Sequence, residues 1–144
     1  RQVGLDHQVD TYFNVSEGRL KLREGNIENS LIFYSRSNQA GPKRSDVVLY
    51  KLAPDPSLKE VLSASNGVLI VVDKQREIWF VDNVKLHLDV VQGLGTFVEI
   101  EAIDADGSHT EDALRDQCDA WIQLLGIKPE DLIDRSYSDL LMEV

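Results

Sequence analysis

Polar and apolar side chains alternate with a period of two along the first two-thirds of the chain. This period is typical of β-strands whose two faces meet different surroundings. The strands that the pattern predicts span residues 9–13, 19–24, 30–36, 45–52, 67–72, 73–81, 84–91 and 96–103. Asp82-Asn83 lies between two of them and is the expected turn of a tight hairpin.

A helical period occurs in only a few places. Residues 58–64 are expected to form a short helix capped by Ser57, and residues 111–125 a longer amphipathic helix capped by Thr110. Shorter helical turns are expected at residues 130–133 and 136–141. Many antiparallel strands with few helices predict an α+β fold, in which the sheet is either open or closed into a barrel.

Several predicted strands carry ionisable side chains on one face and apolar side chains on the other. Arg19, Lys21 and Arg23 share one face, and Leu20 and Leu22 share the opposite face. The same alternation recurs further along the chain at Lys74/Arg76, Lys85/His87/Asp89 and Glu99/Glu101. Two interpretations are open: a sheet with a solvated outer face, which is the commoner meaning of this pattern, or a barrel with a charged interior and apolar faces turned outward.

A charged interior of this kind would suit a triphosphate. Arginine and lysine supply hydrogen-bond donors for phosphate oxygens, and carboxylates bind a hard divalent cation such as Mg²⁺. Other phosphate and metal motifs are missing from the sequence. No glycine-rich stretch ends in Gly-Lys-Ser/Thr, and His7, His87 and His109 do not have the spacing of zinc ligands. His87 is interpreted as a structural or bystander residue, and a contact with a ligand is the alternative.

The composition of the chain argues against two classes of binding partner, nucleic acids and membranes. The formal net charge of −10 argues against a protein that binds nucleic acid through phosphate contacts, so no nucleic-acid partner is expected. No apolar run reaches membrane-spanning length, so no membrane partner is expected either. The 144 residues are expected to form one domain. Cys118 is the single cysteine, which excludes an intrachain disulfide and fits a cytoplasmic protein.

Five segments, in this order along the chain, resemble a known family. They are QVDTYF at residues 8–13, GRLKLRE at 18–24, DKQREIWF at 73–80, VKLHLDVVQGLGTFVEIE at 84–101 and RSYSDLL at 135–141. Together they are similar to the CYTH superfamily of triphosphate tunnel metalloenzymes, and the last segment is similar to its class IV adenylyl cyclase branch. The resemblance implies an antiparallel β-barrel, the triphosphate tunnel, with a charged interior and flanking helices.

The resemblance also implies roles for individual residues. The residues that would bind the triphosphate are Arg19, Lys21, Arg23, Arg36, Lys74 and Arg76. For Arg19 and Lys21 an exposed position on the rim is an equally open interpretation. The residues that would hold the metal, Mg²⁺ or Mn²⁺, are Asp89, Glu99 and Glu101.

One family element is absent from these residues. The superfamily's first strand carries a Glu-x-Glu-x-Lys pattern, and no such pattern precedes Gln8. The domain at residues 1–144 is therefore expected to be N-terminally incomplete and its barrel to lack the first strand. An open sheet edge invites pairing between two chains, so a homodimer is a further expectation.

The favoured function is a class IV adenylyl cyclase that converts ATP into cyclic AMP and pyrophosphate with a divalent metal. Three alternatives stay open. The first is a triphosphatase that hydrolyses tripolyphosphate, thiamine triphosphate or a nucleoside triphosphate. The second is a non-catalytic module that binds a triphosphate or nucleotide, and the third is an interaction domain without a ligand.

Overall fold

The computed structural model describes residues 1–36 and 40–144, except for the side chains at positions 36 and 45. In this part of the chain, seven strands form one antiparallel sheet in the order β4-β3-β2-β1-β5-β6-β7. The strands are β1 (Gln2–Phe13), β2 (Arg19–Gly25), β3 (Asn29–Arg36), β4 (Ser45–Lys51), β5 (Val68–Val81), β6 (Val84–Val91) and β7 (Gly95–Ala102). The helices are α1 (Pro56–Asn66), α2 (Glu111–Leu124) and α3 (Tyr137–Met142), with a 3₁₀ turn η1 at Pro129–Asp131.

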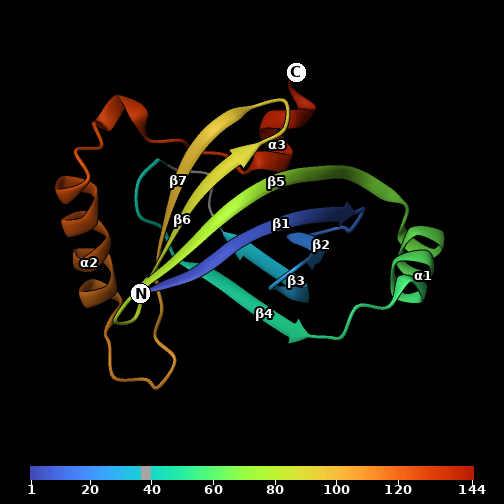
Figure 1. The fold of residues 1–144 in the computed structure, drawn as a ribbon, viewed down its shortest axis with the longest axis horizontal. Helices are drawn as coiled ribbons and strands as arrows, with labels where there is room; N and C mark the ends of the chain where they lie inside the picture. The colour runs from blue at the N-terminus through green and yellow to red at the C-terminus, as the bar shows by residue number, and fades with distance from the viewer. Residues whose placement is uncertain (37–39) are drawn as a thin grey trace.

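The sheet is curled into a half-barrel (Figure 1). Among the described residues its edge strands β4 and β7 each pair on one side only. The expected antiparallel barrel architecture is thus confirmed, in an open form. None of the helices in the described part of the chain is long and apolar enough to cross a membrane.

Two of the strands differ clearly from the sequence prediction. β1 begins at Gln2 instead of residue 9, because its first half pairs with the far end of the long strand β5. Residues 67–72 and 73–81 were expected as two strands but form the single strand β5. Asp73 fits within that strand because its carboxylate meets His7 Nε2 of β1 at 2.7 Å.

The N-terminal cap agrees with the prediction for α2 and differs from it for α1. Thr110 caps α2 as expected, since its side chain accepts from the Ala113 amide. The cap of α1 is Asp55 and not Ser57, because the Asp55 carboxylate accepts from the Ser57 amide and Pro56 occupies the first helical turn.

Strand register decides which side chains face the inside of the curl. Arg23 of β2 lies opposite Asp10 of β1, and Arg76 of β5 lies opposite Asp89 of β6, so these four side chains share the concave face. The apolar faces turn outward, as the charged-interior interpretation requires. α2 packs on β7 and α1 lies near β1 (Figure 1). Val90 of β6 and Val98 of β7, on the outer face, remain 55% and 45% exposed.

One end of the concave face is an apolar core. Tyr12, Ile32, Tyr34, Val72 and Val91 form its buried cluster. Tyr137 and Leu141 of α3 pack on this cluster together with Phe97 and Leu94. The concave face therefore has an aromatic end closed by α3 and, next to it, a charged middle.

Candidate functional site

The charged middle of the concave face contains two groups of ion pairs. The first is built around Asp10, which is 1% exposed. Its carboxylate accepts from Arg23 Nε and Nη2, both at 2.9 Å, and from Lys74 Nζ at 2.7 Å. Lys21 Nζ lies further away, 3.7 Å from Asp10 Oδ2. We call Asp10 with these three cations the Asp10 cluster.

The Asp10 cluster carries more positive than negative charge. Burial alone would raise the pKa of Asp10, but the charges of Arg23, Lys74 and Lys21 outweigh it and hold that pKa well below its ordinary value. Asp10 is therefore ionised at neutral pH. Three basic side chains beside one carboxylate leave this part of the face with a local excess of positive charge.

The second group, the Arg76 cluster, comprises Arg76, Asp89, Glu99, His87 and Tyr137. Arg76 donates from Nε and Nη2 to the two Asp89 oxygens, at 2.8 Å each, and its Nη2 lies 3.4 Å from Glu99 Oε1. The Tyr137 hydroxyl donates to Asp89 Oδ2 at 2.8 Å. His87 Nδ1 lies 3.5 Å from Glu99 Oε2, and its Nε2 is buried with no hydrogen-bond partner.

Glu99 lies within the curl of the sheet although 42% of its side chain remains accessible. Burial would raise its pKa, but the charge of Arg76 and the contact with His87 hold the pKa of Glu99 well below the ordinary value. Glu99 thus adds a second ionised carboxylate beside Arg76, and this one is still reachable from solvent.

A further group of polar contacts borders the two clusters. Glu28 accepts from Lys85 Nζ at 2.5 Å and from Gln8 Nε2 at 2.9 Å. Burial would raise the pKa of Glu28, but Lys85 and Arg23 lower it to about 2. Asp6 is fully buried and accepts from three backbone amides of the β2–β3 turn, at residues 26–28, which fixes that turn against β1.

The structure brings together four of the six cations that the sequence singled out: Lys21, Arg23, Lys74 and Arg76. Arg19 lies nearer the end closed by α3, is 35% exposed in its side chain and pairs with Asp139 at 2.9 Å. Arg36 ends β3, but its side chain lies outside the described residues. A role in triphosphate binding stays a prediction for all six.

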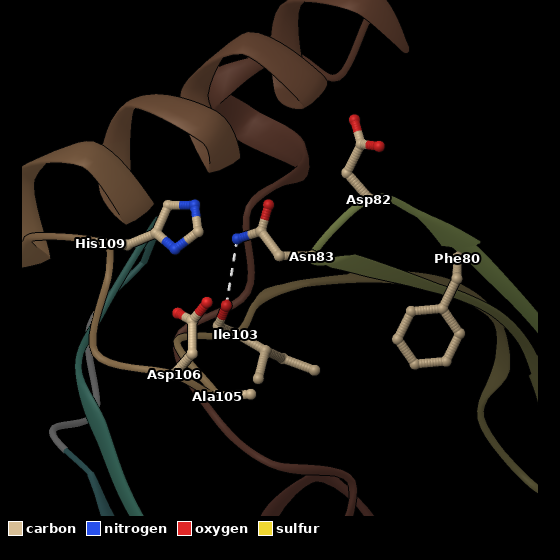
Figure 2. A pocket seen from close by; sticks show the side chains of 7 residues that line it. All are labelled: Phe80, Asp82, Asn83, Ile103, Ala105, Asp106 and His109. Atoms are coloured by element: carbon tan, nitrogen blue, oxygen red, sulfur yellow. Dashed lines mark hydrogen bonds between the residues drawn. The ribbon is translucent and has the colours of Figure 1, made fainter.

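A pocket lies away from these clusters, beside the β5–β6 turn (Figure 2). It has a volume of about 340 Å³ and is lined by Phe80, Asp82, Asn83, Ile103, Ala105, Asp106 and His109. It presents two carboxylates and no lysine or arginine, so it is poorly suited to a polyphosphate.

The family of the chain follows from comparison with known proteins. Residues 2–137 match the CYTH domain family. The chain belongs to this family. Its members are mostly enzymes, cyclases and triphosphatases, that act on triphosphate substrates with the help of a metal. No curated protein sequence matches the chain.

Solved structures of other proteins have a similar fold. A conserved hypothetical protein from Pyrococcus furiosus is 24% identical with a TM-score of 0.82, over 97% of this chain and 85% of that chain. A protein from Pyrococcus horikoshii is 24% identical with a TM-score of 0.77, over the same shares of both chains. A protein from Vibrio parahaemolyticus, described as a candidate adenylate cyclase, is 24% identical with a TM-score of 0.75 over 98% and 83%. At these identities the likeness shows the CYTH fold.

The predicted metal ligands Asp89, Glu99 and Glu101 can be compared with the requirements of a divalent metal. Glu99 and Glu101 alternate on β7 and offer carboxylate oxygens, which hard cations prefer. The buried His87 Nε2 without a partner is a polar atom that an ion or water would satisfy. Both oxygens of Asp89 are already bound by Arg76 and Tyr137, so a metal would have to share them. Glu99 therefore fits a metal best, because its carboxylate lies inside the curl and is reachable from solvent, whereas Glu101 is exposed and belongs to neither cluster.

Elsewhere in the described residues, one group of potential ligands has its ligand atoms within 4.8 Å of one another: Asp104, Asp106 and His109. Two backbone contacts account for part of this arrangement. The Ser108 amide donates to Asp106 and the His109 amide donates to Asp104. The group is thus explained as the internal structure of the β7–α2 loop.

Sequence reasoning missed Asp10 and Tyr137 as members of the site. Asp10 alternates with Gln8 and Tyr12 in β1, so an acidic side chain at an inward position was the available signal. Tyr137 had no such signal, because it meets Asp89 from 48 residues further along the chain. His87 was interpreted as structural, and its contact with Glu99 places it inside the Arg76 cluster.

Replacing Tyr137 with phenylalanine is expected to lower the free energy of unfolding by about 1 kcal/mol. The ring contact with Phe97, at 5.0 Å between centroids, is kept, while Asp89 loses one donor. Burial and the neighbouring carboxylates raise the pKa of Tyr137 far above its ordinary value, so the hydroxyl donates at all physiological pH values. Urea unfolding would measure the change. Tyr50→Phe, at a site that is 69% exposed, is the control and should show none.

Proposed function

We propose that this CYTH domain is a metal-dependent adenylyl cyclase that converts ATP into cyclic AMP and pyrophosphate on its concave face. The observation that carries the proposal is the convergence of Lys21, Arg23, Lys74 and Arg76 inside the curl. Their carboxylate partners on β1, β6 and β7 leave a local excess of positive charge in the Asp10 cluster. A polyphosphate supplies the missing negative charge in the form that arginine and lysine bind best.

Two features favour a cyclase over other reactions of the family. The C-terminal Ser-Tyr-Ser-Asp-Leu-Leu segment is similar to that of the class IV cyclase branch, and its Tyr137 contacts the Arg76 cluster. The Vibrio parahaemolyticus protein described as a candidate adenylate cyclase has the same fold.

In the proposed mechanism, the cations position the polyphosphate and neutralise its charge. Arg23 and Arg76 each use two donors for an aspartate and keep further N–H groups for phosphate oxygens, since a guanidinium has five. The ribose 3′ oxygen attacks the α-phosphorus while the bond from that phosphorus to the β-phosphate oxygen breaks. Lys74 and the two arginines stabilise the charge that moves onto the leaving pyrophosphate. A divalent metal, held by Glu99 with Asp89, would neutralise further phosphate charge and favour ionisation of the attacking hydroxyl.

A triphosphatase is the second candidate, and one observation favours it. The aromatic end of the concave face is packed with Tyr12, Tyr34 and Phe97 and is closed by α3. A small substrate such as tripolyphosphate would need no base pocket, and water would then be the nucleophile.

Product analysis tests the proposal. The protein is incubated with ATP, thiamine triphosphate or tripolyphosphate, each with Mg²⁺ or Mn²⁺, and the products are separated by chromatography. We expect cyclic AMP and pyrophosphate from ATP, and at least a 100-fold (~10²) loss in Glu99→Ala, as for removal of a group that stabilises transition-state charge. Glu130→Gln, an exposed position in η1, is the control and should keep full activity.

The other outcomes of this experiment are equally clear. Orthophosphate release without cyclic AMP would replace the cyclase by a triphosphatase. No product, combined with thermal stabilisation by tripolyphosphate, would leave a binding module. Neither product nor stabilisation would contradict a triphosphate site altogether.

The proposal includes a cytoplasmic setting, supported by the single free Cys118. It also includes a homodimer. The edge strand β4 supports this, because Val48 and Tyr50 are 71% and 69% exposed and an open edge favours strand pairing. Light scattering in solution would measure the oligomeric state.

A further inference from the structure

The Asp10 carboxylate does not hold the three basic side chains of its cluster equally closely. All three approach the same oxygen, Oδ2, at 2.7 Å from Lys74, 2.9 Å from Arg23 and 3.7 Å from Lys21. The first two are hydrogen bonds, whereas the Lys21 distance is beyond hydrogen-bond range. One carboxylate thus faces three potential positive charges, and Lys21 is the one that it holds least.

The immediate neighbours of Lys21 are two tyrosine rings. Its Nζ lies 5.5 Å from the Tyr12 ring centroid and 5.1 Å from that of Tyr34, and its side chain is 14% exposed. Aromatic faces favour a cation, but less than a carboxylate does. The ammonium form of Lys21 is therefore only weakly stabilised by its neighbours, although its side chain is largely buried.

The charged and titratable groups around Lys21 come from several strands. Arg19 and Arg23 flank it on β2, Lys74 approaches from β5, and Tyr12 and Tyr34 come from β1 and β3. Opposing these, the negative charges are Asp10 of β1 and, from across the curl, Glu99 of β7. Arg19 is itself paired with Asp139 of α3.

Burial and the surrounding charges together favour the neutral amine of Lys21 more than they would in an exposed lysine. Burial lowers the pKa of Lys21, repulsion by Arg23 and Lys74 lowers it further, and Asp10 and Glu99 only partly offset this, so that it falls to about 7. Burial also lowers the pKa of Lys74, but its 2.7 Å bond to Asp10 favours the charged form. The arginines stay charged at all relevant pH values.

We propose that Lys21 takes up one proton from solvent when a polyphosphate enters the concave face, so that binding and protonation are coupled at this amine. The inference rests on the proposed function only in that a polyphosphate binds to the Asp10 cluster. The step is a simple association: the neutral amine, a proton and the polyanion give an ammonium group beside a phosphate chain, and no covalent bond changes.

The direction of the coupling follows from charge. A polyphosphate adds several negative charges to a cluster that has one carboxylate for three cations, which raises the affinity of Lys21 for a proton. By linkage, the protonated enzyme binds the polyphosphate more tightly than the neutral form does. A neutral ligand would not have this effect, so Lys21 makes the site selective for highly charged anions.

Titration calorimetry with tripolyphosphate measures the uptake. Binding is followed at about pH 8 in two buffers that differ in ionisation enthalpy, and the slope gives the protons exchanged per site. Lys21→Arg keeps the positive charge but cannot lose it, so the ligand's own titration is common to both proteins. We expect the wild type to take up about 0.9 more protons than Lys21→Arg at about pH 8 and about 0.1 more at about pH 6.

A matched control and a second measurement complete the test. Lys59→Arg, at a partly exposed site in α1 where the side chain is 42% accessible, should show the wild-type uptake. In protein labelled with ¹³C at lysine Cε, the resonance that disappears in Lys21→Arg should titrate near neutral pH and move to higher pH with tripolyphosphate. Equal proton uptake in wild type and Lys21→Arg would overturn the inference while binding itself stands. An absence of binding in every form would remove the proposed function, and an ordinary lysine titration for Lys21 in the free protein would overturn the inference by itself.

Discussion

Replacing Arg76 with methionine is expected to reduce turnover to background and to lower the free energy of unfolding by about 3–5 kcal/mol. Arg76 is 2% exposed and is bound to both oxygens of Asp89, with Glu99 close by. Methionine replaces the aliphatic stem of the arginine side chain but leaves a buried carboxylate without its cation. In the proposed reaction, the same change removes a guanidinium from the polyphosphate.

Chemical denaturation and product analysis would measure the two effects separately. Arg115→Met, at an exposed position in α2, is the control and should change neither. The double variant Arg76→Met/Asp89→Asn is expected to recover most of the stability, because it removes both partners of the buried pair, but to recover no activity. A single variant as stable as the wild type would contradict the structural role of Arg76. A fully active one would contradict its proposed role in binding.

Local alternation was enough to predict which charged side chains share one face of the sheet. Arg19, Lys21 and Arg23 alternate with leucines in β2, and strand geometry alone then places the three cations on one face. The same rule placed Lys74 with Arg76 and Glu99 with Glu101. Whether such a face points to solvent or into a curl depends on the neighbouring strands, and here the family resemblance supplied the answer that periodicity could not.

The partner of each cation could not be predicted, because partners come from distant strands. Asp10 meets Lys74 from 64 residues away, and Tyr137 meets Asp89 from 48 residues away. The first half of β1 was missed for a similar reason. Gly4 and Asp6 are poor strand formers, yet Asp6 is fully buried because the turn at residues 26–28 donates three amides to it. Long-range pairing therefore overrides local propensity in the part of the chain that organises the site.

Asp10→Asn is expected to lower the free energy of unfolding by about 3 kcal/mol at neutral pH, because Lys21, Arg23 and Lys74 would lose their shared carboxylate. The effect should depend on pH with a definite sign. The pKa of Asp10 is lower in the folded protein than the value of about 3.9 expected when unfolded. The stabilisation by its charge is therefore fully present above about pH 4 and is lost as the pH falls through the lower, folded-state pKa.

Denaturation of wild type and Asp10→Asn between neutral pH and about pH 2 would test this. The difference in stability should be largest near neutral pH and should shrink below about pH 4 as the wild type loses the charge that the variant never had. Glu99 also has a lowered pKa and adds a slope of the same sign, but it does so in both proteins and cancels in the difference. Asp119→Asn, at an exposed position in α2, should match the wild type throughout. A difference that stays constant down to the lowest pH would mean that the asparagine variant is destabilised through shape or hydrogen bonding, and that Asp10 does not organise the three cations by its charge.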